Sequence, residues 1–125
     1  MLIDSSILID HLRGRVEAQQ FLSSVLASGQ LVTSAVVEAE LLSGARNLAE
    51  QRQIDLFISR FQIHPVESAD SNLSLQLLRD HRLSSNIGWL DCLIAACALR
   101  LQVPVATLNE RHFRVIPGLS VARPY

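Results

Sequence analysis

Several acidic residues lie in segments that a folded chain would bury. Asp4 ends the apolar run that opens the chain, and Asp91 begins an apolar helical segment. A third acid, Glu38 or Glu40, stands in the apolar segment 35–42. An isolated buried carboxylate is strongly unfavourable unless it is neutralised, hydrogen-bonded or bound to a cation. Because these acids come from three separate core segments, we expect them to share one cation.

Each acid also has a purely structural explanation. Asp4 could cap the first helix. Asp91 would stand in a first helical turn, where the helix dipole favours an acid whatever its function. Glu38 and Glu40 are separated by one residue and point in roughly opposite directions on a helix, so one of them can face solvent. Periodicity alone does not choose between them.

Composition limits the classes of function. The chain has 125 residues, of which 49% are hydrophobic. This composition suits one packed domain, 1–125, and the chain is too short for two. The net charge of −1 argues against a strongly basic protein that binds nucleic acid by bulk electrostatics. Every basic residue is an arginine. The lack of lysine excludes P-loop nucleotide hydrolysis, Schiff-base chemistry and phospho-receiver signalling.

The two cysteines indicate a reduced, cytoplasmic protein. Cys92 and Cys97 are five residues apart on one predicted helix and point to different sides, so no disulfide is expected between them. The apolar segments 1–12 and 90–101 are interrupted by charged residues and are too short for a membrane span. No export signal is expected, and no membrane association.

Strands and helices are predicted to alternate along the chain. Capping residues and helical spacing predict helices over 5–13, 15–28, 34–45, 47–61, 68–83 and 89–101, and short apolar runs predict strands at 1–4, 30–33, 62–66, 103–107 and 119–122. This alternation predicts an α/β sandwich with a mostly parallel sheet. Sites in such sheets form at the carboxyl ends of the strands, where Asp4, Ser34 and Thr107 stand.

Four segments resemble the motifs of the PIN-domain family. Residues 2–10 are similar to its first motif, an acid after strand one followed by small hydroxyl residues. Residues 33–44 resemble the second motif, in which the acid precedes paired leucines and a glycine. Residues 90–99 resemble the third, an acid that leads into an Ile-Ala-Ala helix, and residues 106–119 resemble the fourth. The motifs cover the chain from end to end, and its length suits the VapC-type toxins of the family.

The resemblance implies a fold, an activity and a set of metal ligands. The fold would be a three-layer α/β/α sandwich, and the activity that of an endoribonuclease toxin of a type II toxin–antitoxin system. The second motif selects Glu40 over Glu38, so Asp4, Glu40 and Asp91 become the catalytic metal ligands. Their oxygen donors favour Mg²⁺ or Mn²⁺. A metal-activated water would attack the phosphodiester and leave 5′-phosphate and 3′-hydroxyl ends.

The fourth motif departs from the acidic pattern of the family. Family members often place an aspartate where this chain has Asn109 or His112, which argues against tight binding of a second metal. Asn109 could still contact a metal or its water. His112 could bind a substrate phosphate, shuttle a proton, or simply pack beside Phe113. Ser6 would orient water or a ligand, or else cap the first helix.

Partners also follow from the resemblance. It implies a homodimer and a VapB-type antitoxin whose tail occupies the acidic site. Phe21, Phe57 and Phe61 could form these surfaces or could belong to the core. RNA would be positioned by arginines near the mouth of the site, for which the candidates are Arg13, Arg15, Arg46 and Arg82.

Two other functions remain open at this stage. The chain could be a non-catalytic RNA-binding or partner-binding PIN module, as the missing fourth acid would favour. It could also be a DNA-directed nuclease with the same site.

Overall fold

The computed structural model describes all 125 residues, and its strands and helices alternate as predicted. The elements are β1 (Leu2–Ile3), α1 (Ser5–Leu12), α2 (Val16–Ser28), β2 (Val32–Ser34), α3 (Ala35–Ser43), α4 (Leu48–Ile58), β3 (Gln62–His64), α5 (Ser68–Ser85), α6 (Trp89–Leu101), β4 (Val105–Ala106), α7 (Glu110–Phe113) and β5 (Val121–Ala122). Helix α6 has the predicted limits. The strands are mostly shorter than predicted, because flanking residues bond elsewhere: the Val103 amide donates to the Ala98 carbonyl at the end of α6.

The strands form a parallel sheet in two hydrogen-bonded groups. In one group β4 lies between β1 and β5, and in the other β2 pairs with β3, all in parallel. The two groups meet where the Thr33 hydroxyl of β2 donates to the Ile3 carbonyl of β1 at 2.6 Å. The order across the sheet is therefore β3-β2-β1-β4-β5. This confirms the predicted parallel sheet.

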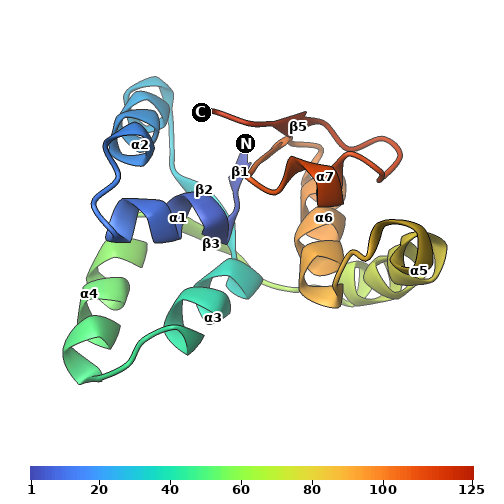
Figure 1. Ribbon diagram of the computed structural model, residues 1–125, viewed down its shortest axis with the longest axis horizontal. Coiled ribbons are helices and arrows are strands. Elements are labelled where there is room, and N and C mark those ends of the chain that lie inside the picture. The colour runs from blue at the N-terminus through green and yellow to red at the C-terminus, as the bar shows by residue number, and fades with distance from the viewer.

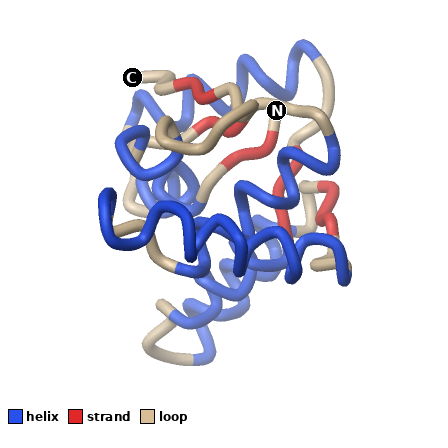
Figure 2. The backbone as a smooth tube through the Cα atoms, turned by 90° about the vertical axis from the view of Figure 1, so that its right-hand side faces the viewer, coloured by secondary structure: helices blue, strands red, loops and turns tan.

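Helices cover both sides of this sheet. Figure 1 shows α1 to α4 on one side of the strands and α5 to α7 on the other, and Figure 2 shows the short strands enclosed by helices. Helices α3 and α6 come from opposite sides and are in contact with each other. The predicted three-layer α/β/α sandwich is confirmed.

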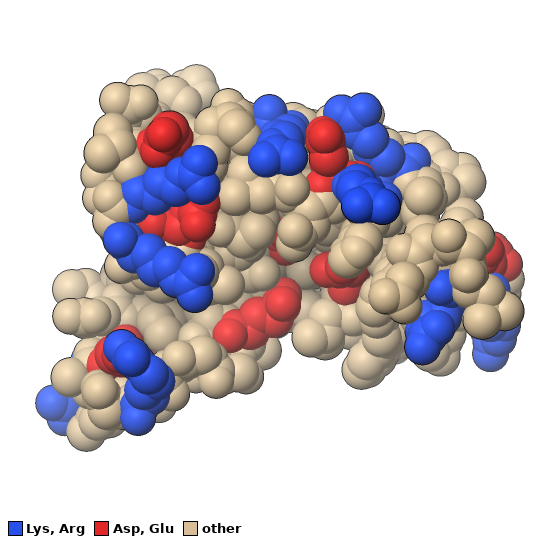
Figure 3. All heavy atoms as spheres, viewed as in Figure 1, with Lys and Arg blue, Asp and Glu red and all other residues tan.

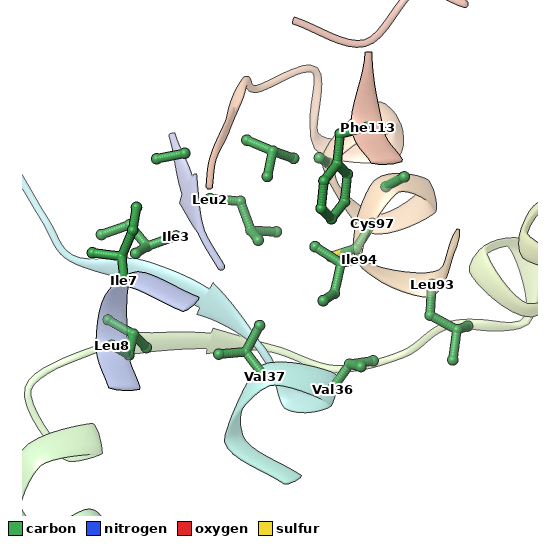
Figure 4. Close-up of a cluster of buried hydrophobic side chains, with 14 of the residues drawn as sticks. Leu2, Ile3, Ile7, Leu8, Val36, Val37, Leu93, Ile94, Cys97 and Phe113 are labelled. Atoms are coloured by element: carbon green, nitrogen blue, oxygen red, sulfur yellow. The ribbon is translucent and has the colours of Figure 1, made fainter. Parts of the chain in front are cut away.

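Strand β1 shows how the sequence produces two packed layers. Successive side chains of a strand point to opposite faces. In Figure 4, Ile3 lies toward Ile7 of α1, whereas Leu2 lies toward Ile94 of α6 and Phe113. All five of these side chains are fully buried. The apolar pair at the start of the chain thus joins both halves of one core, and Asp4 follows directly after it.

Helix α6 is buried along most of its length, as its apolar sequence predicts. Residues 92–98 are all buried, and both cysteines are free. The helix is tied to α5 by Arg100, whose guanidinium donates to both carboxylate oxygens of the buried Asp70, at 2.8 and 3.0 Å. No helix of the structure has the length and apolar character needed to cross a membrane.

Two of the three phenylalanines considered for partner surfaces belong to the core. Phe57 and Phe61 are buried, and their rings meet edge to face with centroids 5.2 Å apart. Phe21 is partly buried and packs against the same core. Phe57 and Phe61 therefore belong to the core, whereas for Phe21 both interpretations stay open. The large apolar side chains that solvent reaches most are Leu83, at 94% exposure, and Leu56, at 75%.

Candidate active site

Asp4 is a buried carboxylate whose oxygens accept several hydrogen bonds. It follows β1 and caps α1, with Oδ1 accepting from the Ser5 amide at 2.8 Å. Oδ2 accepts from the Ser6 hydroxyl at 2.9 Å and from the Thr107 hydroxyl at 2.7 Å. Only 1% of Asp4 is exposed. Both interpretations of Asp4 therefore apply at once: the residue caps a helix and also stands at the carboxyl end of a central strand.

The parallel pairing of β1 with β4 brings Thr107 to Asp4. Ile3 is in register with Ala106, so the residues that follow each strand meet at the same edge. Thr107 is fully buried, and its hydroxyl also accepts from the Asn109 amide at 2.9 Å. The sequence places Thr107 at a strand end, but only the pairing of the strands shows that its hydroxyl donates to Asp4.

Ser6 joins the first and fourth motifs. Its hydroxyl donates to Asp4 and accepts from the Leu108 amide at 3.1 Å. The hydroxyl of Ser6 is also 3.4 Å from that of Thr107. The side chain therefore lies beside the acidic site, as the first motif implies.

Glu40 of α3 is the acid in least favourable surroundings. Its Oε1 atom is buried and has no hydrogen-bond partner. Burial, followed by the charges of Asp4 and Asp91, raises the pKa of Glu40 to about 7, although the hydroxyl of Ser5 opposes this rise. The structure therefore places the carboxyl of Glu40 within electrostatic reach of the other two acids.

Asp91, in the first turn of α6, is held by a histidine. The Nδ1 atom of His112 lies 2.9 Å from Asp91 Oδ2. Burial raises the pKa of Asp91, the hydrogen bond with His112 opposes this, and the charge of Asp4 adds to it. His112 thus contacts one of the predicted ligands directly, an arrangement that the sequence left open. The neighbouring Asn109 is exposed and begins α7.

Glu40 of α3 and Asp91 of α6 lie close enough for the charge of Asp91 to act on Glu40, as the charge of Asp4 also does. In the space-filling view, acidic atoms lie around the centre of the molecule between these helices, and arginine atoms lie over β5 and α7 above them (Figure 3). Each acid comes from a different element: the end of β1, the middle of α3 and the start of α6. The negative charges of the three carboxylates repel one another, which is consistent with the raised pKa values of Glu40 and Asp91.

The donor chemistry fits a hard divalent cation. Three carboxylates and nearby hydroxyls supply only oxygen ligands, and the buried Glu40 Oε1 lacks any partner. As the side chains stand, no three His, Cys, Asp or Glu residues converge closely enough to hold one ion. Binding would therefore draw at least one carboxylate inward, and the positive charge of the ion would offset the repulsion among the acids.

The candidate RNA-binding arginines divide into two groups. Arg13 and Arg46 line a cavity of about 500 Å³ together with Glu40, although Arg46 is paired with Glu50 at 2.7 Å. Arg15 instead pairs with Asp10 and Glu17, and its guanidinium lies over the ring of Tyr125. Arg82 is in the last turn of α5 and forms no ion pair. The structure thus brings Arg13 and Arg46 beside Glu40, whereas Arg15 and Arg82 do not line that cavity.

Comparison with known proteins identifies the family. The family model for the PIN domain matches residues 1–119. The chain therefore belongs to the PIN-domain family. It is similar to the Mycobacterium tuberculosis protein named Ribonuclease VapC10, with 40% identity over 121 residues that cover 96% of this chain and 90% of the relative. It is also similar to Ribonuclease VapC19 of the same organism, with 34% identity, 95% of this chain and 96% of the relative.

Solved structures share the whole fold. A toxin–antitoxin complex from Klebsiella pneumoniae contains a chain with a TM-score of 0.81 and 29% identity, and the match covers 99% of this chain and 97% of that one. VapBC2 of Rickettsia felis, solved bound to a promoter DNA fragment, gives a TM-score of 0.80 at 22% identity, covering 97% and 96%. The latter likeness concerns the fold alone.

Proposed function

We propose that this chain is a metal-dependent endoribonuclease and the toxin of a toxin–antitoxin pair. The observation that carries the proposal is that the charges of Asp4 and Asp91 act on the carboxyl of Glu40, although the three acids come from three different elements. It is supported by the relatives named as VapC ribonucleases, at 34% and 40% identity over nearly the whole chain. The similar chain in the Klebsiella pneumoniae toxin–antitoxin complex supports the toxin role.

The three acidic residues share one role in this proposal. Asp4, Glu40 and Asp91 would hold Mg²⁺ or Mn²⁺, which when bound stabilises charge on the phosphate and activates the attacking water. The hydroxyls of Ser6 and Thr107 fix the orientation of Asp4. Glu40 must give up its proton before it can serve as a ligand, since the pKa of its carboxyl is about 7.

The residues of the fourth motif act around Asp91. His112 holds one oxygen of the Asp91 carboxylate and so orients the side chain for its ligand role. Asn109 remains a candidate for contact with a ligand water or with substrate. Arg13 and Arg46 are the predicted arginines best placed to hold a substrate phosphate near Glu40.

Partners and location complete the proposal. A VapB-type antitoxin would cover the acidic site, and the toxin would form a homodimer through surfaces other than Phe57 and Phe61, which the core already buries. A cytoplasmic location is supported by the two free cysteines, Cys92 and Cys97.

The first test is cleavage of a pool of transfer and ribosomal RNAs by antitoxin-free protein. Reactions contain Mg²⁺, Mn²⁺ or a chelator, beside DNA of matched length. We expect discrete cuts in RNA that require the metal and that vanish in Asp4→Asn and Asp91→Asn. The matched control is Asp55→Asn, the same chemical change at an exposed position of α4, which should cleave like the wild type.

Three outcomes would overturn the proposal. Intact RNA in every lane, from protein shown to be folded, would favour a non-catalytic binding module. Cleavage of DNA but not RNA would favour a DNA-directed nuclease with the same site. Cuts that survive both active-site variants would mean that another group performs the chemistry, or that a contaminant does.

A further inference from the structure

A second polar cavity lies against the acidic site and contains two arginines that the sequence did not single out. It has a volume of about 730 Å³ and is bounded by the end of α5, the β4–α7 connection, α7 and the chain after β5. Arg111 and Arg123 line it, one from α7 and one from beyond β5. Pairing of β4 with β5 brings these distant segments together. The volume lies within the range of roughly 300–1,000 Å³ typical of small-ligand sites.

Neither guanidinium is paired with the side chain of an Asp or Glu residue. Neither Arg111 nor Arg123 forms an ion pair, whereas the acid that lines the cavity, Glu110, is paired with Arg114 at 2.8 Å. The Arg123 Nε atom donates to the main-chain oxygen of Tyr125, the last residue of the sequence, at 3.0 Å, and its two terminal nitrogens have no hydrogen-bond partner. The wall of the cavity thus carries positive charge that the protein itself does not use.

The remaining polar groups of the cavity connect it to the proposed catalytic acids. His112 lines the cavity and also contacts Asp91 at 2.9 Å. Asn109 lines it too. Its main-chain N–H donates to the hydroxyl of Thr107, which in turn donates to Asp4. A ligand in the cavity would therefore lie next to the acidic site.

Charge explains why such a cavity is needed. A cluster of three carboxylates repels a polyanion, and one divalent ion offsets only part of their negative charge. Arginine binds phosphate through two parallel hydrogen bonds, which gives both attraction and a defined orientation. Phosphate contacts fix the register of a nucleic acid on a protein without reading its sequence.

From these observations we infer that the Arg111–Arg123 cavity binds the phosphodiester backbone of single-stranded RNA beside the scissile bond. This inference rests on the proposed ribonuclease function and assigns it a substrate-binding site. Ser84, Ser85 and Asn86 supply further hydrogen-bonding groups on the facing wall. A nucleotide held here is positioned by its phosphates, while cleavage takes place at the carboxylates.

The test measures RNA binding and cleavage separately. A fluorescent single-stranded RNA oligonucleotide is titrated with full-length protein in chelator, where no cleavage is expected, at several salt concentrations. In the double variant Arg111→Gln/Arg123→Gln we expect roughly tenfold weaker binding. We also expect the slope of log affinity against log salt to fall by about 1.4, because each lost phosphate contact on a single strand contributes about 0.7. In metal, KM should rise by a similar factor while kcat changes little.

Matched variants separate this site from general charge. Arg52→Gln/Arg79→Gln removes the same charge from exposed positions of α4 and α5 that line no such cavity and form no ion pair, and should bind RNA like the wild type. Arg111→Lys/Arg123→Lys keeps the charge but loses the paired N–H donors of each guanidinium. It should show the salt slope of the wild type with only part of its affinity. Thermal unfolding of each variant confirms that it is folded.

Three results would overturn the inference. If wild-type protein cleaves RNA and both glutamine double variants bind equally well, the ribonuclease proposal stands and this site is wrong. If RNA affinity is unchanged but binding of the purified antitoxin weakens, the cavity belongs to the partner protein. If wild-type protein neither binds nor cleaves RNA, the inference fails together with the function on which it rests.

Discussion

Glu40 should make the metal-free protein less stable as the pH rises. Its pKa is raised from an ordinary value of 4.5 to about 7, first by burial and then by the charges of Asp4 and Asp91. A carboxyl whose pKa is raised in the folded state has no effect on stability below its unfolded pKa, because it is protonated in both states. At higher pH its ionisation disfavours the folded state. Stability is therefore lost as the pH rises from 4.5 through about 7.

The size of this effect follows from the pKa. At about 1.4 kcal/mol for each pH unit, the rise corresponds to roughly 3 kcal/mol. Because the Glu40 side chain is only partly buried, solvent screening reduces this to about 1–2 kcal/mol. Glu40→Gln removes the ionisation and should raise the free energy of unfolding by that amount at about pH 8, with no difference at about pH 4.

The assay is urea unfolding in chelator across this pH range. Glu38→Gln makes the same chemical change two residues away on α3 and should leave the pH profile of the wild type unchanged. Parallel profiles for the wild type and Glu40→Gln would refute the reasoning, because the unpartnered buried carboxylate would then carry no cost. Adding Mn²⁺ should reverse the order, since the ion binds ionised Glu40 and stabilises only the wild type.

Three further perturbations follow from single contacts. Thr107→Val removes a buried hydroxyl donor to a carboxylate and should lower the free energy of unfolding by about 1–2 kcal/mol, measured by chemical denaturation; an unchanged value would mean that the donor adds nothing. Arg100→Met leaves the buried Asp70 unpaired and should cost about 3 kcal/mol at neutral pH. Burial raises the pKa of Asp70, but pairing with Arg100 outweighs burial, so the net pKa is lowered. The stability that the pair contributes is therefore lost as the pH falls, and the stabilities of the variant and the wild type should be most similar in acid. His112→Ala should weaken Mn²⁺ binding about tenfold by calorimetry, because Asp91 loses the group that orients it; unchanged affinity would contradict this role.

The sequence predicts elements well where local signals are strong. Helix α6 has the predicted limits because its apolar run is long and begins after Gly88. The caps at Ser34 and Asn47 also lie where α3 and α4 begin, each accepting from an amide of the first turn. The strands are harder, because a two-residue strand such as β4 is defined by its partners rather than by its own residues.

The amino-acid sequence alone shows which residues are candidates for catalysis. Acids in three apolar segments mark Asp4, Asp91 and one glutamate as costly to bury, and the motif order gives the family. These signals are local, since the residue type and its immediate neighbours contain the information.

The three-dimensional fold is needed to show which side chains meet. The hydroxyl of Thr107 reaches Asp4 because β1 and β4 pair in register across about a hundred residues of chain, and His112 reaches Asp91 because α7 packs on α6. Arg111 and Arg123 share a cavity for the same reason. Such contacts depend on the register of strands and the docking of helices. Those features are set by the packing of the entire core, and no local pattern of residues encodes them.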